Sequence, residues 1–340
     1  MHFGPTDAQE RLRERVRAFL ARVSPPAEVR RLMDDDLGHD PGVWSAIGEI
    51  GLLDPDLGWV ERAVVLEEAG AVLLCAPYLS TVTAGAFLDP GARSRTATLA
   101  VAEASGAWEE AAVQARATGP PWRLEGEKSY VVDGLAAGVL VVAARRDDTA
   151  DVALFQVDAG APGLDRAPLP TVDRTRRQAR VTLRATPARL LDGSVDAAVD
   201  LCAVALAAEQ VGGAQRCLDM AVEHARRRVQ FGRPIGSFQA VKHLCADMLL
   251  ELESARSAAS YAASALARGA GDLPVAASVA KSCCSEAYVK VATDSLHVHG
   301  GLGFTWDHDA HLYFKRARSS QLLFGDPRHH RERLVRRLGL

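Results

Sequence analysis

Residues 195–228 read VDAAVDLCAVALAAEQVGGAQRCLDMAVEHARRR, and residues 229–239 continue as VQFGRPIGSFQ. The first stretch contains no proline and repeats apolar residues at helical spacing, which predicts one long helix with a basic C-terminal end. The second stretch predicts a tight Gly-Arg-Pro turn, after which another helix begins near Ser237. A helix much longer than the globular average of about 11 residues is typical of a helical bundle.

Three further helical segments complete a predicted C-terminal four-helix bundle. Residues 238–268 and 278–300 have helical periodicity, and a fourth helix begins near His308 and continues toward the C-terminus. A break is expected at residues 325–327, because Gly-Asp-Pro favours a turn. One side of residues 278–300 carries a row of apolar residues, which predicts a broad contact with a second chain. The row consists of Val279, Cys283, Ala287, Val291 and Leu296.

Residues 7 to about 90 also favour helices. The clearest is residues 6–23, where Thr6 and Gln9 have the spacing of a capping box. Residues 42–53 and 60–74 predict two more. One face of the first helix is apolar, and its members are Leu12, Val16, Phe19, Leu20 and Val23.

Residues 97 to about 190 change to short runs rich in Val, Leu and Ala, bounded by Gly, Pro and Asp. This pattern predicts antiparallel strands in a small barrel or sandwich. No Gly-x-Gly-x-x-Gly motif occurs, so a parallel Rossmann sheet is disfavoured. The predicted fold class is α+β, with an N-terminal helical domain (1–95), a middle β-domain (96–192) and the C-terminal bundle (193–340).

Composition and charge exclude several classes of function. The chain has 340 residues, 48% hydrophobic and 24% charged, and its net charge of −3 argues against nucleic acid as the main ligand. The six cysteines include no Cys-x-x-Cys pair, so we expect neither a metal site nor a disulfide framework. No apolar run reaches the length of about 18 residues that spans a membrane. The first residues lack a signal-peptide pattern, so a cytoplasmic location is expected.

Two C-terminal motifs carry the chemistry. In residues 228–239, Arg228 lies beside the aromatic Phe231 and the amides of Gln230 and Gln239, a combination suited to an anion attached to a ring system. Residues 297–308, HVHGGLGFTWDH, place three glycines within four residues. A helix end needs only one glycine, so the others indicate a backbone that a ligand approaches closely.

The segments RVQFGRPIGSFQAVKHLCADM (228–248) and HVHGGLGFTWDHDAHLYFKRA (297–317) strongly resemble the C-terminal domain of the acyl-CoA dehydrogenase family. Weaker resemblances to the family's N-terminal and middle domains follow in the right order, so the similarity covers nearly the whole chain. The resemblance implies the family's fold and an FAD cofactor that is bound between subunits.

The resemblance also implies which residues bind FAD. The first motif supplies contacts to the flavin nucleotide, and the glycine motif of a neighbouring subunit cradles the pyrophosphate and adenine side. His297 stands where the family usually has Gln, and it can still donate a hydrogen bond. The implied residues are Arg228, Gln230, Phe231 and Gln239 in the first motif and His297, Gly300 and Gly301 in the second.

Two departures from the family pattern remove hydroxyl groups near the flavin. Ala102 replaces the Thr of the middle-domain flavin motif, and Tyr130-Val131-Val132 replaces Trp-Ile-Thr. Such divergence resembles the short, atypical members of sterol side-chain and secondary-metabolite pathways, many of which work as heteromeric pairs.

The family's reaction removes an α-proton from an acyl thioester while a hydride leaves the β-carbon, and it needs a carboxylate base. Alignment of Arg333-Leu334 with the family's Arg-Leu pair assigns the base to Asp326, whereas gapless counting from Gly300 assigns it to Phe324. The base position that some members use instead falls at Cys202. Asp200 lies nearby and is expected to be a helix-start residue.

The resemblance therefore implies FAD-dependent α,β-dehydrogenation of an acyl-CoA or carrier-bound acyl thioester, with Asp326 as the base. One alternative is a non-catalytic partner subunit that completes an FAD site in a heteromer, and another is a different flavin-dependent oxidation on the same fold. The expected partners are an electron-transfer flavoprotein or similar acceptor and a second chain in a homo- or heteromeric dimer or tetramer.

Overall fold

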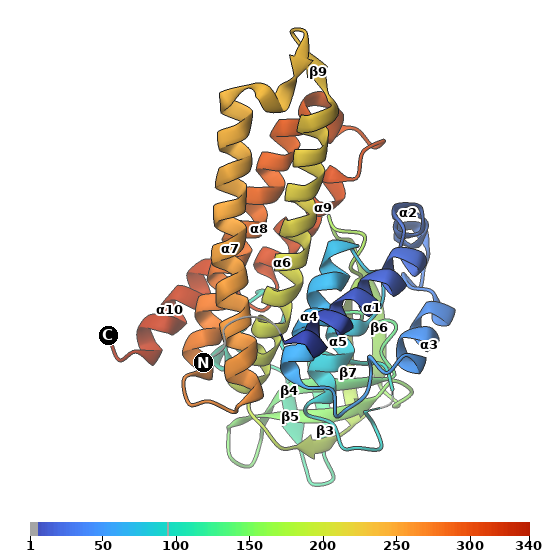
Figure 1. Ribbon diagram of the computed structural model, residues 1–340. Coiled ribbons are helices and arrows are strands. Elements are labelled where there is room, and N and C mark those ends of the chain that lie inside the picture. The colour runs from blue at the N-terminus through green and yellow to red at the C-terminus, as the bar shows by residue number, and fades with distance from the viewer. Residues whose placement is uncertain (1–5, 94) are drawn as a thin grey trace. The chain divides into compact units, whose positions relative to one another are not determined.

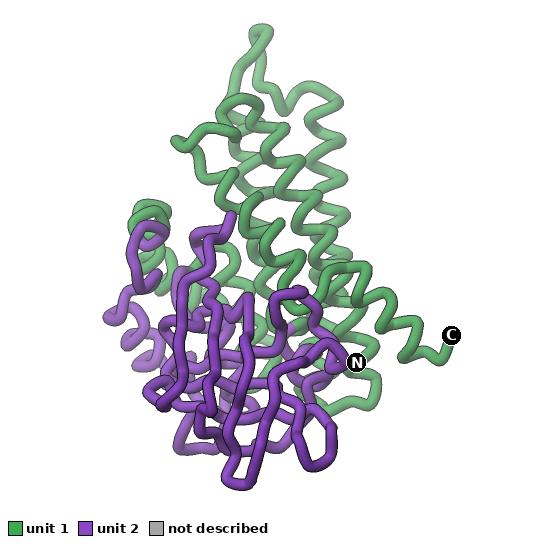
Figure 2. Tube along the Cα trace, turned by 180° about the vertical axis from the view of Figure 1, so that it is seen from behind, with its two compact units in different colours: residues 1–31, 58–74, 203–340 green, residues 32–57, 75–202 purple. Residues whose placement is uncertain are grey.

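The chain is described by a computed structural model over residues 6–93 and 95–340. It forms two compact units (Figure 2), each assembled from separate stretches of the sequence. The first unit comprises Met1–Arg31, Gly58–Leu74 and Ala203–Leu340, and the second comprises Leu32–Leu57 and Cys75–Cys202. The division into domains 1–95, 96–192 and 193–340 stays a prediction.

The helices of the first unit confirm the predicted bundle (Figure 1). The predicted break is confirmed as well, because one helix ends at Leu322 and the next begins at Pro327. The bundle helices are α6 (Val195–Arg227), α7 (Gln239–Ala267), α8 (Leu273–His299) and α9 (Ala310–Leu322), followed by α10 (Pro327–Arg337). The first residues of α6, up to Cys202, belong to the second unit.

Two N-terminal helices, α1 (Asp7–Val23) and α4 (Trp59–Ala71), also belong to the first unit. The predicted capping box is confirmed, since Gln9 N donates to Thr6 Oγ1 at 3.3 Å and Thr6 N donates to Gln9 Oε1 at 2.9 Å. Four of the five predicted apolar residues of α1 are buried, and Val23 is half-buried. The next helix, α2 (Pro26–Asp34), crosses the boundary between the two units.

The described part of the second unit contains α3 (Pro41–Glu49), α5 (Tyr78–Gly85) and an eight-stranded sheet. The strand order is β6-β7-β3-β2-β4-β5-β8, with β1 beside β4. This path ends at β6 and β8, so the described strands form an open sheet, which fits the sandwich rather than the barrel. The strands are β1 (Ala97–Ala100), β2 (Arg116–Thr118), β3 (Arg123–Val132), β4 (Val139–Arg146), β5 (Val152–Asp158), β6 (Leu164–Leu169), β7 (Gln178–Pro187) and β8 (Arg189–Leu191).

Most strand pairs are antiparallel, as expected, but β1 and β2 both run parallel to β4. Ala97 pairs with Val139, and Arg116 pairs with Arg145. A parallel pair needs a long connection, and the chain between β1 and β4 supplies one because it includes β2 and β3.

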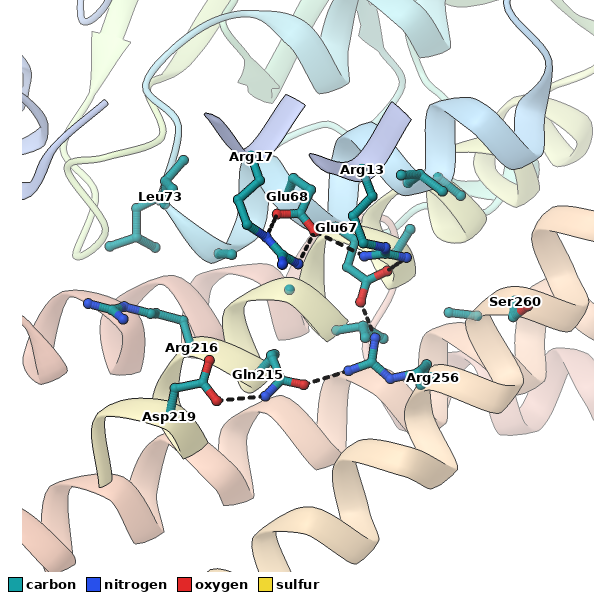
Figure 3. Close-up of a pocket in the computed structure, with 18 of the residues that line it drawn as sticks. Arg13, Arg17, Glu67, Glu68, Leu73, Gln215, Arg216, Asp219, Arg256 and Ser260 are labelled. Atoms are coloured by element: carbon teal, nitrogen blue, oxygen red, sulfur yellow. Dashed lines mark hydrogen bonds and ion pairs between the residues drawn. The ribbon is translucent and has the colours of Figure 1, made fainter. Parts of the chain in front are cut away.

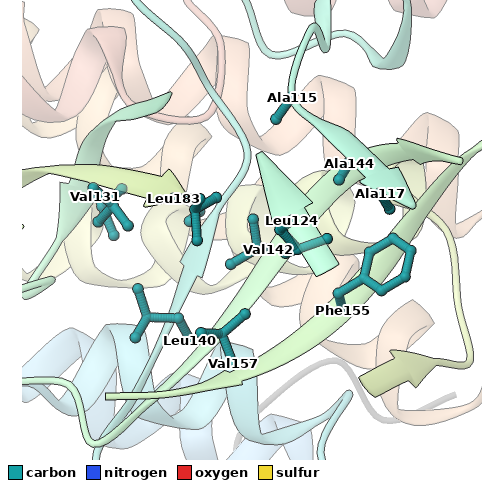
Figure 4. Packing of buried hydrophobic residues seen from close by; sticks show 12 residues of the cluster. Ala115, Ala117, Leu124, Val131, Leu140, Val142, Ala144, Phe155, Val157 and Leu183 are labelled. Atoms are coloured by element: carbon teal, nitrogen blue, oxygen red, sulfur yellow. The ribbon is translucent and has the colours of Figure 1, made fainter. Parts of the chain in front are cut away.

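The core of the second unit is built from alternate residues of neighbouring strands (Figure 4). Leu140 and Val142 of β4 and Phe155 and Val157 of β5 point toward one side of the sheet and are all at most 1% exposed. The intervening residues of β4, Val139, Val141 and Ala143, are buried as well, so this strand is covered on both faces. The cluster fixes the register of the strands that carry the middle segment of the predicted site.

Helix α6 is the only helix, among the residues that the structure describes, with the length and apolar composition to cross a membrane. Its most apolar window is 94% buried inside the protein. The apolar composition of α6 is therefore explained by its position as the core helix of the bundle.

Candidate functional site

A two-residue hairpin follows α6 and carries the first predicted motif. Strands β9 (Val229–Gln230) and β10 (Arg233–Pro234) pair antiparallel, and Phe231 and Gly232 form the turn between them. Both turn residues have positive φ angles, 52° and 75°, as the commonest two-residue hairpin turn requires. The Phe231 side chain is 92% exposed, so the hairpin holds an aromatic ring out in solvent.

The other predicted residues of this motif are also exposed: Arg228 just before the hairpin, Gln230 on it and Gln239 after it. Arg228 belongs to none of the ion pairs found among residues 6–93 and 95–340, and Gln230 Nε2 donates only locally, to Val229 O at 2.9 Å. The ring of Phe231 meets that of Phe238 edge-on with 6.1 Å between centroids. A short 3₁₀ turn then leads into α7, whose first residue is Gln239. The hairpin thus offers a cation, amides and a free ring to a ligand.

The glycine motif forms a 3₁₀ turn, Gly300–Phe304, at the end of α8. Gly300 has a φ of +61°, which a glycine adopts without strain. A Cβ atom at Gly300 or Gly301 would meet no described atom within 4 Å, so the backbone there is open on one side. The His297 side chain is 63% exposed, with Nδ1 3.9 Å from Asp294 Oδ1.

A stack of three histidine rings connects the ends of the two helices that carry these motifs. The His299 ring lies between those of His224 and His308, with centroids 4.6 and 4.3 Å away. His299 Nδ1 donates to Ser295 O at 2.7 Å, and burial lowers the pKa of His299 to about 4, so the ring is neutral near pH 7. The stack brings the hairpin and the glycine turn to the same end of the bundle.

Sequence reasoning did not assign this histidine stack. Two of its members lie inside the quoted glycine motif, and a His-x-His pair at a helix end was the available signal. His224 gave no signal, because its partner is 75 residues away and only the packing of α6 on α8 brings the two together. The described residues contain no group of three or more His, Cys, Asp or Glu side chains that could hold a metal ion.

The residues of both turns fit FAD, which carries two phosphates and two ring systems. Arg228 offers charge to a phosphate, Phe231 offers a ring face, and the open backbone at Gly300 and Gly301 admits a close approach. A side chain at either glycine would fill the space in which a ligand can reach the main chain.

The middle segment of the predicted site lies between β1 and β3 in the second unit. Glu103 Oε1 accepts hydrogen bonds from Gln114 N, Ala115 N and Lys128 Nζ at 2.8–2.9 Å, which ties down the loop after β1. Ala102 and Val132, which replace the family's hydroxyl residues, are at most 3% exposed. Among the positions of the Trp-Ile-Thr replacement, only Tyr130 is exposed, at 38%, with a positive φ of 58°.

Asp326 is the N-cap of α10, and its Oδ1 accepts a hydrogen bond from His329 N at 2.7 Å. Phe324, the other aligned position, is 5% exposed. Cys202 is no candidate base, because burial raises its thiol pKa to about 12. The expectation that Asp200 is a helix-start residue is wrong. Helix α6 begins at Val195, and Asp200 is buried in its second turn.

The predicted apolar row on α8 is wrong as an intermolecular face. Ala287, Val291 and Leu296 are at most 4% exposed because they pack inside the chain's own bundle. Val279, at 40%, is the member left exposed, and Cys283 is half-buried. The spacing showed a helix face but could not show that the same bundle already covers it.

The first unit also contains a hollow of about 1520 Å³ among α1, α4, α6 and α7 (Figure 3). Several charged side chains that line it are paired: Arg13 contacts Glu67 and Glu68 at 3.0 Å, and Arg256 contacts Glu67 and donates to Gln215 Oε1. Through these pairs, Arg13 of α1 and Arg256 of α7 each join their helix to α4.

The fold is that of an α+β protein whose helical bundle carries two exposed turns at one end, the hairpin after α6 and the glycine turn after α8. The family description "Acyl-CoA dehydrogenase, C-terminal domain" matches residues 193–339. The chain is 36% identical over 338 residues to acyl-CoA dehydrogenase IpdE2 of Mycobacterium tuberculosis, covering 95% of both chains. The chain therefore belongs to the acyl-CoA dehydrogenase family, and its function is FAD-dependent dehydrogenation of an acyl-CoA thioester.

Two solved structures extend this similarity to the whole fold. The steroid ACAD Tcur3481–Tcur3483, a G363A variant, has a TM-score of 0.91 at 29% identity and covers 98% of each chain. The ChsE4–ChsE5 complex of Mycobacterium tuberculosis has a TM-score of 0.90 at 28% identity and covers 100% of this chain and 99% of that one. The α+β fold predicted from the sequence is confirmed.

Proposed function

We propose that the chain dehydrogenates a bulky, steroid-derived acyl-CoA at its α,β bond. The observation that carries this substrate class is the similarity, over 98% of both chains, to a protein described as a steroid ACAD. The test is reduction of the bound flavin by a polycyclic acyl-CoA and by a short linear acyl-CoA. Faster bleaching by the polycyclic thioester supports the proposal, and a preference for the linear one contradicts it.

FAD is held in this proposal by Arg228, Gln230, Phe231 and Gln239 of the hairpin and by His297, Gly300 and Gly301 of the glycine turn. FAD, when bound, accepts the hydride that leaves the β-carbon. The exposure of the Phe231 ring and of the glycine backbone supports this assignment, because each is open to an FAD molecule that is shared with a second chain. A homo- or heteromeric dimer or tetramer would then complete each site.

Asp326 is the proposed base for the α-proton. Its Oδ1 caps α10, and the carboxylate has a second oxygen that can accept a proton. The reduced enzyme would pass its electrons to an electron-transfer flavoprotein or similar acceptor in the cytoplasm.

A second candidate role in the same reaction is that of a non-catalytic partner subunit within a heteromeric dehydrogenase. Two observations favour it: Asp326 already serves as a helix cap, and Phe324 fills the other aligned base position with a buried ring. The relatives ChsE4–ChsE5 and Tcur3481–Tcur3483 are each named as a pair of proteins. In this case the base comes from a homologous chain, and this chain supplies part of the FAD site.

One experiment separates the two candidates. The chain is purified alone and together with any homologue that is encoded beside it. Light scattering with absorbance detection gives the oligomeric state and flavin content, and bleaching by acyl-CoA is followed by absorbance. Flavin and bleaching in the chain alone support a self-sufficient dehydrogenase. Flavin and bleaching only in the mixed assembly support the partner subunit, and a monomer that retains full flavin contradicts the shared site in both.

A further inference from the structure

Lys281, in the first half of α8, has a side chain with no exposed surface. Its Nζ donates to three oxygens: Ser285 Oγ at 2.9 Å, Gln321 O at 3.1 Å and Gly325 O at 2.9 Å. A buried lysine is uncommon unless its charge is compensated. Here three N–H groups meet three oxygens, which compensates the ammonium with neutral acceptors.

Two of these acceptors belong to the end of α9 and the loop that follows it. Gln321 lies in the last turn of α9, where carbonyl groups lack helical partners and carry partial negative charge. Gly325 directly precedes Asp326. Lys281 therefore fastens both ends of the connection between α9 and α10.

A second buried group holds the residue in between. His330 is fully buried, and its Nε2 donates to Phe324 O at 2.8 Å. Burial, and then the nearby charge of Lys281, lower the pKa of His330 to about 2, so the ring is neutral. The carbonyls of two consecutive residues, Phe324 and Gly325, are thus held from inside the protein.

The loop needs such support, because its backbone is strained. Phe324 has a φ of +58°, a conformation that is unfavourable in free energy for a residue with a side chain. Gly325 has a φ of +98°. A backbone of this kind persists only where the surrounding structure over-determines it. Lys281 and His330 supply three hydrogen bonds to this stretch of main chain.

We propose that Lys281 is a positioning residue: its hydrogen bonds to Gln321 O and Gly325 O fix the loop, and with it the place of Asp326 at the start of α10. The loop-fixing role stands on the geometry alone. The consequence for turnover rests on the proposed role of Asp326 as the base.

The protonation state of Lys281 gives a second way to test this role. Burial lowers the pKa of Lys281 to about 7, against the opposing effects of Cys284 on α8 and Asp326. The other groups that face it are His330 on α10, the Gln321 carbonyl of α9 and Ser285, which contacts Gln210 of α6. Opening of the loop hydrates Lys281 and returns its pKa toward 10.5, so opening takes up a proton and becomes less favourable as the pH rises above about 7.

The test is hydrogen exchange of residues 321–330 in the assembled flavoprotein for wild type, Lys281→Met and Lys290→Met. Lys290 is a matched control on the same helix, exposed and paired with Asp294 at 2.7 Å. Lys281→Met is expected to exchange this segment about tenfold faster or more, with α6 unchanged, while Lys290→Met matches wild type. Unchanged exchange in Lys281→Met overturns the proposal.

Flavin reduction by acyl-CoA provides the functional readout. Lys281→Met is expected to lower kcat by about 10²-fold while KM and FAD content stay at wild-type values, because only the geometry of the base is lost. Suppose that Asp326→Asn inactivates the enzyme. If Lys281→Met then exchanges the loop faster but keeps the wild-type kcat, the positioning role is overturned. If Asp326→Asn leaves turnover intact, the base assignment fails instead, and loop exchange alone judges Lys281.

If Lys281→Met does not fold, the wild-type protein decides. Exchange of residues 321–330, corrected for the intrinsic effect of pH, is followed from about pH 6 to about pH 9. Slower exchange of this segment as the pH rises above about 7 supports the proposal, and a flat profile overturns it.

Discussion

Gly70 of α4 and Gly212 of α6 each lie against the main chain of the other's helix. A Cβ atom at Gly212 would stand 1.7 Å from Glu67 O, and one at Gly70 would stand 2.0 Å from Glu209 O. Neither contact can be relieved by rotating a side chain, because both obstacles are backbone oxygens. The two glycines therefore set how closely the N-terminal helix α4 packs on the first helix of the bundle.

Gly212→Ala is expected to destabilise the protein by about 1–3 kcal/mol or more, because the added methyl group forces the helices apart. The measurement is the midpoint of urea denaturation. Gly85→Ala is the matched control, since this helical glycine has nothing within 4 Å of a would-be Cβ and alanine is the better helix former. Equal midpoints for the two variants would show that the crossing tolerates a wider spacing.

Arg228→Ala is expected to lose bound FAD without loss of helical content, because the side chain is exposed and alanine suits a helix end. Flavin absorbance per chain and circular dichroism measure the two effects. Arg227→Ala, next in the chain and paired with Glu223 at 2.7 Å, should keep its flavin. Stoichiometric flavin in Arg228→Ala would remove this residue from the site.

Asp326→Asn is expected to lower turnover by about 10²–10⁴-fold while FAD stays bound. Asparagine caps a helix about as well as aspartate, so α10 should remain in place and the stability should change little. Stopped-flow flavin reduction gives the rate, and thermal denaturation checks the cap. Turnover equal to wild type would point to Asp200 or to a base in a partner chain.

His299 is expected to make the protein less stable in mild acid. Its pKa falls from 6.5 to about 4 on folding, so between these values the unfolded chain binds more protons and stability drops as the pH falls. The largest contribution is about 1.4 kcal/mol per pH unit. Denaturation midpoints measured across this range should be flatter for His299→Gln than for wild type, and His243→Gln, an exposed site, should follow wild type.

The long helices and the turns between them could be predicted from the sequence because their signals are local. The uninterrupted periodicity of α6 and the Gly-Asp-Pro break before α10 each lie within a few turns of chain. The sequence predicted a Gly-Arg-Pro turn here, but the turn residues are Phe231 and Gly232. The sequence did not indicate Phe231 because phenylalanine rarely adopts a positive φ.

The missed features depend on distant contacts. Strand β6 contains only half-buried and exposed residues without regular alternation, and β2 and β8 are three residues each. The burial of Lys281 has no signal in the helical pattern of α8, where a lysine indicates a solvent face. Its acceptors at Gln321 and Gly325 are about forty residues along the chain and meet it only in the folded bundle.

The outward-pointing ring of Phe231 has a consequence for the newly made chain. Phe231 is 92% exposed, and Phe304 and Trp306 are also more than half exposed. The chain therefore presents apolar aromatic side chains to solvent until a ligand or another chain covers them. Such side chains promote non-specific aggregation in a crowded solution. Simultaneous synthesis of the chains that assemble together would shorten this vulnerable interval, and production of this chain by itself would prolong it.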